Sequence, residues 1–276
     1  MPPARWTIAL LLCLGSALGA LSPAASAAPR RVATLVPWVA EALEAVPAKA
    51  LVVASTRRFV HAPPRAGLVD LGDGHAPNLE LLIASAPDLV IADKRWHARF
   101  GERVEGTGAE VLWIEANSVD ATFAALIEVG RRVGAETEMT AAVRDATTRL
   151  ARLHAAGRPR SLALFGAPGS FLVISDRTWI GDLLRRLGYE PVVPTEASER
   201  MPGYLAVSDE FLAAAKPDVI LLLAHGDPEA VARAFAEDWA RIRDSSPPVV
   251  PLDPALFATN PGLRLVEAAQ SILGGD

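Results

Sequence analysis

The chain has 276 residues, of which 32 are acidic and 27 basic, and its formal net charge is −5. This excess of acid argues against nucleic acid or an anionic membrane surface as the main partner. The length allows one large domain or two modest domains with a substantial core.

The first 27 residues have the pattern of a secretory signal peptide. A basic start at Arg5 precedes an almost wholly apolar run over residues 7–21, and Ala25-Ser26-Ala27 supplies small residues for cleavage. That run is shorter than the roughly 20 residues that span a membrane. Cys13, the single cysteine, follows Leu12 rather than the small residue that precedes a lipid-modified cysteine, so we interpret it as part of the signal. We expect an exported, cysteine-free mature chain.

Apolar periodicity and turn signals predict a first α/β unit over residues 28–134. Strands are expected at 31–36, 51–54, 89–92 and 110–115, and helices at 37–46, 78–86 and 118–133. The stretch Ser55–Ala76 between two of these elements is irregular. A loop of this length is usually functional or mobile.

A helix without glycine or proline is predicted over Glu136–Ala156, near the midpoint of the mature chain. At 1.5 Å per residue it would form a rod of roughly 30 Å. We interpret the segment 135–157 as a rigid connection between two lobes. An ordinary packing helix is the alternative.

Residues 158–276 are predicted to form a second α/β unit. Strands are expected at 160–166, 171–174, 219–221 and 249–252, helices at 177–187, 209–215, 228–241 and 263–273, and a loop at 191–204.

One sequence pattern occurs in both halves. Asn78 and Ser208 can each cap a helix that is followed by Pro-Asp and an unbroken apolar strand, and the two copies lie 130 positions apart (208 minus 78). Such strands suit a parallel sheet that is buried on both faces. Two similar lobes follow, unless the recurrence is a chance property of α/β proteins.

The mature chain resembles the class III periplasmic substrate-binding proteins of ABC importers, which serve iron(III)-siderophores, vitamin B12 and haem. The resemblance is carried by the order and spacing of several motifs: Asn78-Leu79-Glu80, Pro87-Asp88-Leu89-Val90-Ile91-Ala92, Phe171-Leu172-Val173-Ile174, Trp179-Ile180-Gly181-Asp182-Leu183-Leu184, Pro217-Asp218-Val219-Ile220, Val250-Pro251-Leu252-Asp253 and Asn260-Pro261-Gly262.

The resemblance implies two doubly wound α/β lobes joined by a single long backbone helix, with ligand in the cleft between them. It also implies a monomer in the periplasm that delivers its ligand to an inner-membrane permease. By motif match, Glu80 and Glu210 would dock onto arginines of that permease. The alternative is that each glutamate only complements the positive end of its helix.

Residues in loops at the strand ends are candidates for ligand binding. They combine guanidinium groups, which bind carboxylates, with aromatic faces, which supply apolar contact area. The first lobe offers Trp38, Arg57, Arg58, His75, Arg95, Trp96 and His97, and the second offers Arg177, Trp179, Arg200, Tyr204 and Phe257. Most of these arginines could instead be solvated surface charges.

This mixture favours an anionic iron(III)-siderophore complex as the ligand. Cobalamin and haem are the alternatives, and His61, His75 or His97 could ligate a haem iron. We expect no resident cofactor and no bare metal site, since no His-x-His or His-Glu-x-x-His spacing occurs. An exported enzyme is disfavoured because no Gly-x-Ser-x-Gly elbow and no phosphate-binding glycine loop is present.

Overall fold

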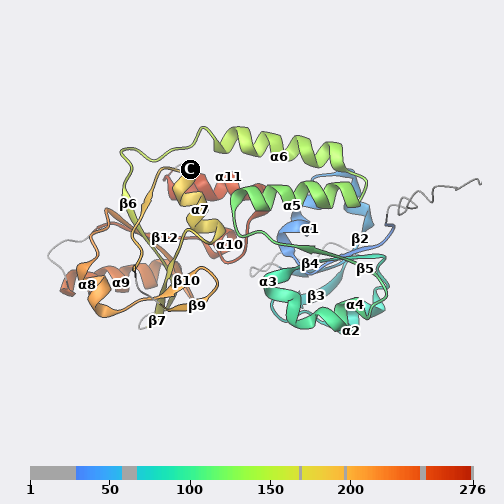
Figure 1. The fold of residues 1–276 in the computed structure, drawn as a ribbon, viewed down its shortest axis with the longest axis horizontal. Helices are drawn as coiled ribbons and strands as arrows, with labels where there is room; N and C mark the ends of the chain where they lie inside the picture. The colour runs from blue at the N-terminus through green and yellow to red at the C-terminus, as the bar shows by residue number, and fades with distance from the viewer. Residues whose placement is uncertain (1–28, 58–66, 168–169, 196–197, 243–246, 275–276) are drawn as a thin grey trace, which may run out of the picture.

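Two α/β lobes make up the computed structural model, which describes residues 29–57, 67–167, 170–195, 198–242 and 247–274. Figure 1 shows the first lobe in blue to green and the second in yellow to red, with helix α6 above α5 and reaching toward α11. The predicted signal segment, Arg58 and His61 lie outside the described residues.

The first lobe is built on a five-stranded parallel sheet in the order β3-β2-β1-β4-β5. This order reverses direction at the first strand, as in doubly wound folds. The strands are β1 (Val32–Thr34), β2 (Val52–Arg57), β3 (Val69–Asp73), β4 (Leu89–Asp93) and β5 (Glu110–Ile114). The helices are α1 (Pro37–Glu44), α2 (Leu79–Ala84), α3 (Lys94–His97), α4 (Gly101–Glu105) and α5 (Val119–Arg132), with 3-10 turns η1 (Pro47–Leu51) and η2 (Ala98–Phe100).

The second lobe has a mixed sheet in the order β12-β11-β6-β7-β10-β9, with β8 paired to β6. Its β12, β11 and β6 are parallel, whereas β7, β10 and β9 continue the sheet in antiparallel fashion. The strands are β6 (Arg160–Ala167), β7 (Ser170–Ile174), β8 (Glu190–Pro191), β9 (Glu199–Met201), β10 (Tyr204–Ala206), β11 (Val219–Ala224) and β12 (Val249–Pro251). The helices are α7 (Trp179–Arg186), α8 (Asp209–Ala214), α9 (Pro228–Ile242), α10 (Pro254–Phe257) and α11 (Leu265–Ile272), with the 3-10 turn η3 (Gly262–Arg264).

The repeated Pro-Asp element has the same structural role in each lobe. Asp88 accepts hydrogen bonds from the backbone N–H groups of Arg30 and Arg31 at 3.0 Å, just before β1. Asp218 accepts from the backbone N–H of Arg160 at 2.7 Å, at the start of β6. In both lobes the carboxylate therefore anchors the start of the neighbouring parallel strand.

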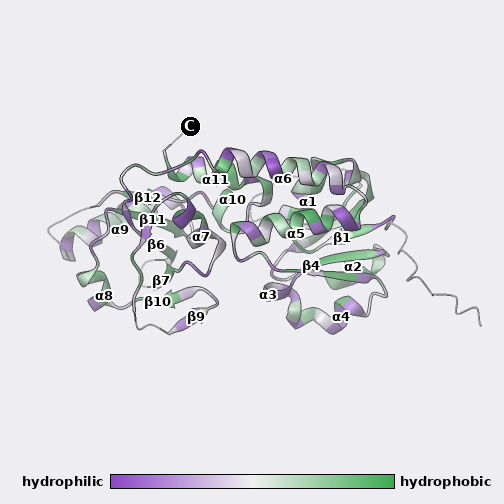
Figure 2. Cartoon of the chain, turned by 45° about the horizontal axis from the view of Figure 1, so that its top comes forward, coloured by the Kyte–Doolittle hydropathy of each residue, from purple (hydrophilic) through white to green (hydrophobic). Residues whose placement is uncertain are grey.

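The predicted long helix is shorter than expected. Helix α6 spans Glu136–Leu150 rather than Glu136–Ala156, so it is about 22 Å long at 1.5 Å per residue. Beyond the helix, the backbone N–H of Ala155 donates to the carbonyl of Leu187 at 2.7 Å. Figure 2 shows that α6 carries both hydrophobic and hydrophilic residues, as expected of a helix packed on one side.

Two segments that we predicted to be irregular contain strands. The predicted loop 55–76 includes β3, and the predicted loop 191–204 includes β9 and part of the antiparallel hairpin with β10. These strands are short and partly exposed, so they lack the unbroken apolar run that marks the buried strands.

One apolar cluster joins the two lobes. It runs from Trp38 in α1 through α5 and α6 to Trp179 in α7 and Phe257 in α10. The C-terminal turn η3 packs against α1, α5 and α6, and α11 packs against α6. The end of the chain therefore contacts helices that precede the second lobe in sequence.

Polar contacts reinforce this junction. The Asp182 carboxylate on α7 accepts a hydrogen bond from the backbone N–H of Val119 at 2.9 Å, at the start of α5. Arg186 donates to Asp182 at 3.0 Å and to Asp120 at 2.6 Å. A side chain of the second lobe therefore caps a first-lobe helix.

We predict that Asp182→Ala lowers the free energy of unfolding by about 1–2 kcal/mol, because it leaves the Val119 N–H without its acceptor. Urea unfolding followed by circular dichroism measures the change. Asp145→Ala is the matched control, since its carboxylate pairs with Arg149 within α6 and is 68% exposed, against 18% for Asp182. The control should change the free energy by less than about 0.5 kcal/mol. Equal effects of the two substitutions would contradict the capping role.

Candidate functional site

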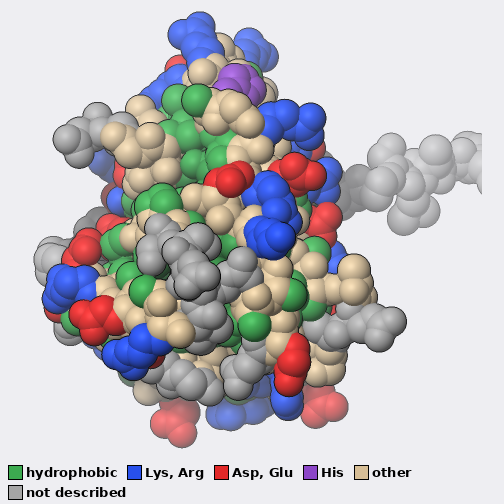
Figure 3. Space-filling view, turned by 90° about the vertical axis from the view of Figure 1, so that its left-hand side faces the viewer, with side chains coloured by type: hydrophobic (Ala, Val, Ile, Leu, Met, Phe, Trp, Pro, Cys, Tyr) green, Lys and Arg blue, Asp and Glu red, His purple; other side chains and the backbone are tan. Residues whose placement is uncertain are grey.

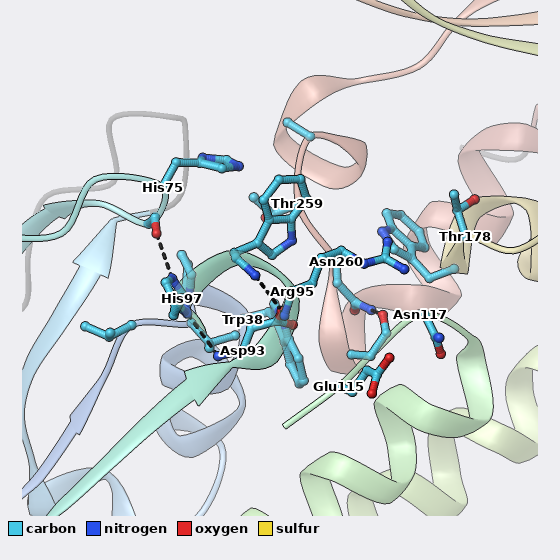
Figure 4. Close-up of a pocket in the computed structure, with 18 of the residues that line it drawn as sticks. Trp38, His75, Asp93, Arg95, His97, Glu115, Asn117, Thr178, Thr259 and Asn260 are labelled. Carbon is cyan, nitrogen blue, oxygen red and sulfur yellow. Dashed lines mark hydrogen bonds between the residues drawn. The ribbon is translucent and has the colours of Figure 1, made fainter. Parts of the chain in front are cut away.

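A pocket between the lobes, here called the cleft pocket, lies where the strands of the first lobe end. Parallel sheets bind ligands beyond the carboxyl ends of their strands, and all five strands of this sheet contribute. Figure 4 shows side chains of both lobes around it. Its lining comprises Leu35–Trp38, Arg57, Asp73–His75, Asp93, Arg95–His97 and Glu115–Asn117 from the first lobe, and Thr178, Trp179, Tyr204 and Phe257–Asn260 from the second.

The aromatic residues divide into a buried floor and an exposed mouth. Trp38, Trp179 and Phe257 are buried, and the rings of Trp179 and Phe257 are stacked with centroids 5.9 Å apart. Trp96 is 39% exposed, and its ring meets that of His75 edge-on at 4.9 Å. The floor is therefore fixed by the core, and the mouth offers aromatic edges to solvent.

A tight turn after β4 orients the first-lobe wall. The carboxylate of Asp93 accepts hydrogen bonds from the backbone N–H groups of Arg95 at 2.8 Å and Trp96 at 3.2 Å, which caps α3. Burial raises the pKa of the Asp93 carboxyl group, although these hydrogen bonds oppose the shift.

His97 is a structural residue of this turn. Its Nδ1 accepts from the backbone N–H of Asp93 at 2.9 Å, and its Nε2 lies 2.7 Å from the carbonyl of Gly74. This arrangement requires the neutral ring with a proton on Nε2. Burial lowers the pKa of His97. Both ring nitrogens are engaged, so the geometry argues against His97 as a haem ligand.

Of the predicted arginines that the structure describes, Arg57 and Arg95 line the cleft pocket, and Arg177 and Arg200 lie outside it. Arg57 lines the cleft pocket but pairs with Asp70 at 2.8 Å, and Arg177 pairs with Glu199 at 3.3 Å in a neighbouring hollow. Arg200 lines a different pocket in the second lobe. Among these described arginines, Arg95 reaches across the cleft, where its Nη1 donates to the carbonyl oxygen of Pro202 at 3.4 Å.

Tyr204 brings a hydroxyl group to the pocket from β10. Burial raises the pKa of the Tyr204 hydroxyl, and the charge of Arg95 opposes that shift. Its ring packs edge-on against Phe165 at 5.5 Å.

Several polar residues of the cleft pocket were missed by the sequence analysis. Glu115 and Asn117 directly follow β5, so the strand-end rule would have found them. Thr178 caps α7 by accepting from the N–H of Gly181 at 3.1 Å. Among the described residues, the hydroxyl of Thr259 is one of the few buried polar atoms with no hydrogen-bond partner. No local sequence signal marks Thr259.

The two docking candidates lie outside the cleft pocket. Glu80 and Glu210 are exposed in the first turns of α2 and α8, behind the caps Asn78 and Ser208. Hydrogen bonds at this cap lower the pKa of Glu210. Leu81 and Ile83 of α2 are also exposed, at 41% and 52%.

Within the described ranges, no group of three or more His, Cys, Asp or Glu side chains is arranged to hold a metal ion. No helix in those ranges is long and apolar enough to cross a membrane.

We predict that His97 makes folding pH-dependent. Because its folded-state pKa lies below the ordinary 6.5, the unfolded chain takes up the proton first as the pH falls. The stability from neutral His97 is therefore complete above about pH 6.5 and is lost as the pH falls through 6.5 toward the folded-state pKa. Between about pH 7.5 and 5.5 the natural chain should lose about 1 kcal/mol more stability than His97→Gln.

Urea unfolding at the two pH values measures this difference. Asp93 is present in both proteins, so its contribution should largely cancel. Replacing the exposed His154 by Gln is the control and should leave the pH dependence unchanged. An unchanged dependence in His97→Gln would refute the assignment.

Known proteins resemble the chain in sequence and in structure. The haem uptake system protein IsdE of Staphylococcus aureus is 38% identical over 81 residues, which is 29% of this chain and only 26% of that protein. A periplasmic haem-binding protein from Pseudomonas aeruginosa is 23% identical with a TM-score of 0.72, and 89% of this chain covers 92% of it. The siderophore-binding protein BauB is 17% identical with a TM-score of 0.69, and 88% of this chain covers 92% of it.

The two structural matches share the fold of this chain, in agreement with the predicted two-lobed architecture. The model of the periplasmic binding protein family matches residues 32–245, which is most of the chain. Proteins of this family bind substrates for transport and are not enzymes, as the sequence predicted. The chain belongs to the periplasmic binding protein family.

Proposed function

We propose that the chain is the periplasmic receptor of an ABC importer and that its ligand is a metal chelate with a flat apolar body and few carboxylates, of which haem is the first candidate. The observation that carries this proposal is the make-up of the cleft pocket. Aromatic rings from both lobes surround a space in which Arg95 reaches from one lobe toward the other.

The charges of the pocket favour a ligand with little net charge. Among the described residues, two arginines line it, Arg57 and Arg95, against three carboxylates, Asp73, Asp93 and Glu115. Asp70 already partners Arg57. A strongly anionic chelate would meet like charge there, whereas a planar ring with one or two carboxylates would place its apolar body on the aromatic floor and a carboxylate at Arg95.

Two side chains are suited to contact the metal of such a ligand. His75 is the first, because Asp73 lies 3.2 Å from its Nδ1. A carboxylate partner of this kind orients histidines that ligate metals. Tyr204 is the alternative, because phenolate oxygen also ligates haem iron. The raised pKa of Tyr204 keeps its hydroxyl protonated until a metal displaces the proton.

An iron(III)-siderophore, which the sequence analysis favoured, is the second candidate. The guanidinium of Arg57 lines the pocket and its side chain is 52% exposed, so a chelate carboxylate could compete with Asp70 for it. Cobalamin is the third.

We predict saturable binding of haemin by the mature protein, measured from the shift of the haem absorption band. Arg95→Gln should weaken binding by about tenfold through the loss of a charge-assisted hydrogen bond. His75→Ala or Tyr204→Phe should move the band, according to which residue ligates the iron. Replacing the distant His154 by Ala is the control and should change neither quantity. Saturable binding of a ferric hydroxamate, catecholate or citrate complex or of cobalamin, with no saturable haemin binding, would overturn haem as the ligand.

We also predict that Glu80→Ala together with Glu210→Ala abolishes uptake by the reconstituted importer and leaves ligand affinity unchanged, because one charge per lobe sets the orientation of docking. The matched control is Glu102→Ala with Glu229→Ala. These glutamates are also exposed in the first turn of one helix of each lobe, α4 and α9. Equal loss of uptake in both double variants, or a loss of ligand affinity, would show that Glu80 and Glu210 do not dock.

A further inference from the structure

A second pocket, here called the second-lobe pocket, shares no lining residue with the cleft pocket. It opens between the ends of β6, β7 and β10 and the helices α8 and α9. Figure 3 views the molecule from this end, and hydrophobic, basic and acidic side chains are interspersed on the described surface.

The walls of the second-lobe pocket are apolar and largely aromatic. The rings of Phe171 and Phe235 meet at 90° with centroids 5.1 Å apart, and Phe235 lies 5.9 Å from the ring of Trp239. Phe171 and Leu212 are only partly buried, although they pack on the same core cluster as Trp239. The pocket thus leaves apolar surface uncovered that an apolar molecule could bury.

Trp239 also has an unmet hydrogen-bonding requirement. Its side chain is 3% exposed, and in the described part of the chain its indole Nε1–H has no acceptor. Buried indole N–H groups usually have a partner, because an unpaired buried donor destabilises the fold. An acceptor supplied from outside the protein would meet this requirement.

The charged groups at the pocket point to the sign of that acceptor. Arg200 lines the pocket and is exposed, and no described carboxylate pairs with it. The nearby acid Asp238 already pairs with Arg241 at 2.8 Å. Two side chains that can donate, the Trp239 indole and the Arg200 guanidinium, therefore line the pocket beside its apolar wall. The guanidinium is exposed, whereas less than 1 Å² of the indole nitrogen is exposed, so a ligand must displace neighbouring atoms to reach it. The carboxylate of Asp238 is committed to Arg241.

We propose that the second-lobe pocket binds a small organic anion, namely an aromatic or short aliphatic body that carries one carboxylate. The body packs on Phe171, Phe235 and Trp239. The carboxylate accepts from Arg200 and, once it displaces the atoms that cover the indole nitrogen, from Trp239. This site is separate from the transport ligand in the cleft. Its test is independent of the test of the proposed function.

The test uses 4-phenylbutyrate and the indole N–H resonances of the mature chain labelled with nitrogen-15. Five tryptophans follow the predicted signal segment, Trp38, Trp96, Trp113, Trp179 and Trp239, and Trp239→Phe identifies the last resonance. We expect 4-phenylbutyrate to shift the Trp239 resonance with a dissociation constant of roughly 1 mM, as for a ligand of about a dozen heavy atoms. The Trp38 and Trp179 resonances of the cleft should remain unchanged.

Two comparisons test whether the pocket recognises the charge of the carboxylate. Arg200→Gln should weaken binding by roughly fivefold, because the guanidinium is exposed, whereas the control Arg177→Gln should leave it unchanged. The neutral alcohol 4-phenylbutanol should bind more weakly than the acid. The proposal is overturned if 4-phenylbutyrate shifts only the cleft tryptophans, if no resonance shift saturates, or if the alcohol binds as tightly as the acid.

Discussion

The site depends on the apolar core that joins the two lobes. Trp38 of the first lobe and Trp179 and Phe257 of the second belong to one cluster, and the same three residues form the floor of the cleft pocket. Because protein cores are close-packed, the distance across the cleft is set by how α5, α6, α7 and α11 pack. The contact from Asp182 to the start of α5 adds a directional bond to this packing.

This construction limits how far the lobes can move apart. Hinged proteins close around ligands through a few loop residues that absorb large changes in backbone angle. Here a packed cluster, the Asp182 contact and the C-terminal turn η3 against α1 all cross the junction. A large opening would expose core side chains and break these bonds. Recognition must therefore come mostly from side chains that are already in position at the strand ends.

The sequence was most informative where its signal was local. Asn78 and Ser208 do cap helices, and the unbroken apolar runs around Val90 and Leu221 are the buried strands β4 and β11. The strands β3 and β9 escaped prediction because each is stabilised by its neighbours in the sheet rather than by its own composition. Likewise, the predicted helix residue Ala155 instead bonds to Leu187, which lies 32 positions away (187 minus 155).

The same distinction between local and distant interactions explains which residues of the candidate site could be predicted from the sequence. The fold rule that ligands bind at strand ends correctly brings His75, Arg95 and Trp96 to one pocket. Composition could not reveal which arginines are already paired with a carboxylate. Arg57 pairs with Asp70 and Arg177 with Glu199 only in the folded chain. Once these pairs are set aside, Arg95 spans the cleft among the described arginines. The charges that remain in the pocket therefore favour a flat chelate with little net charge over a strongly anionic chelate.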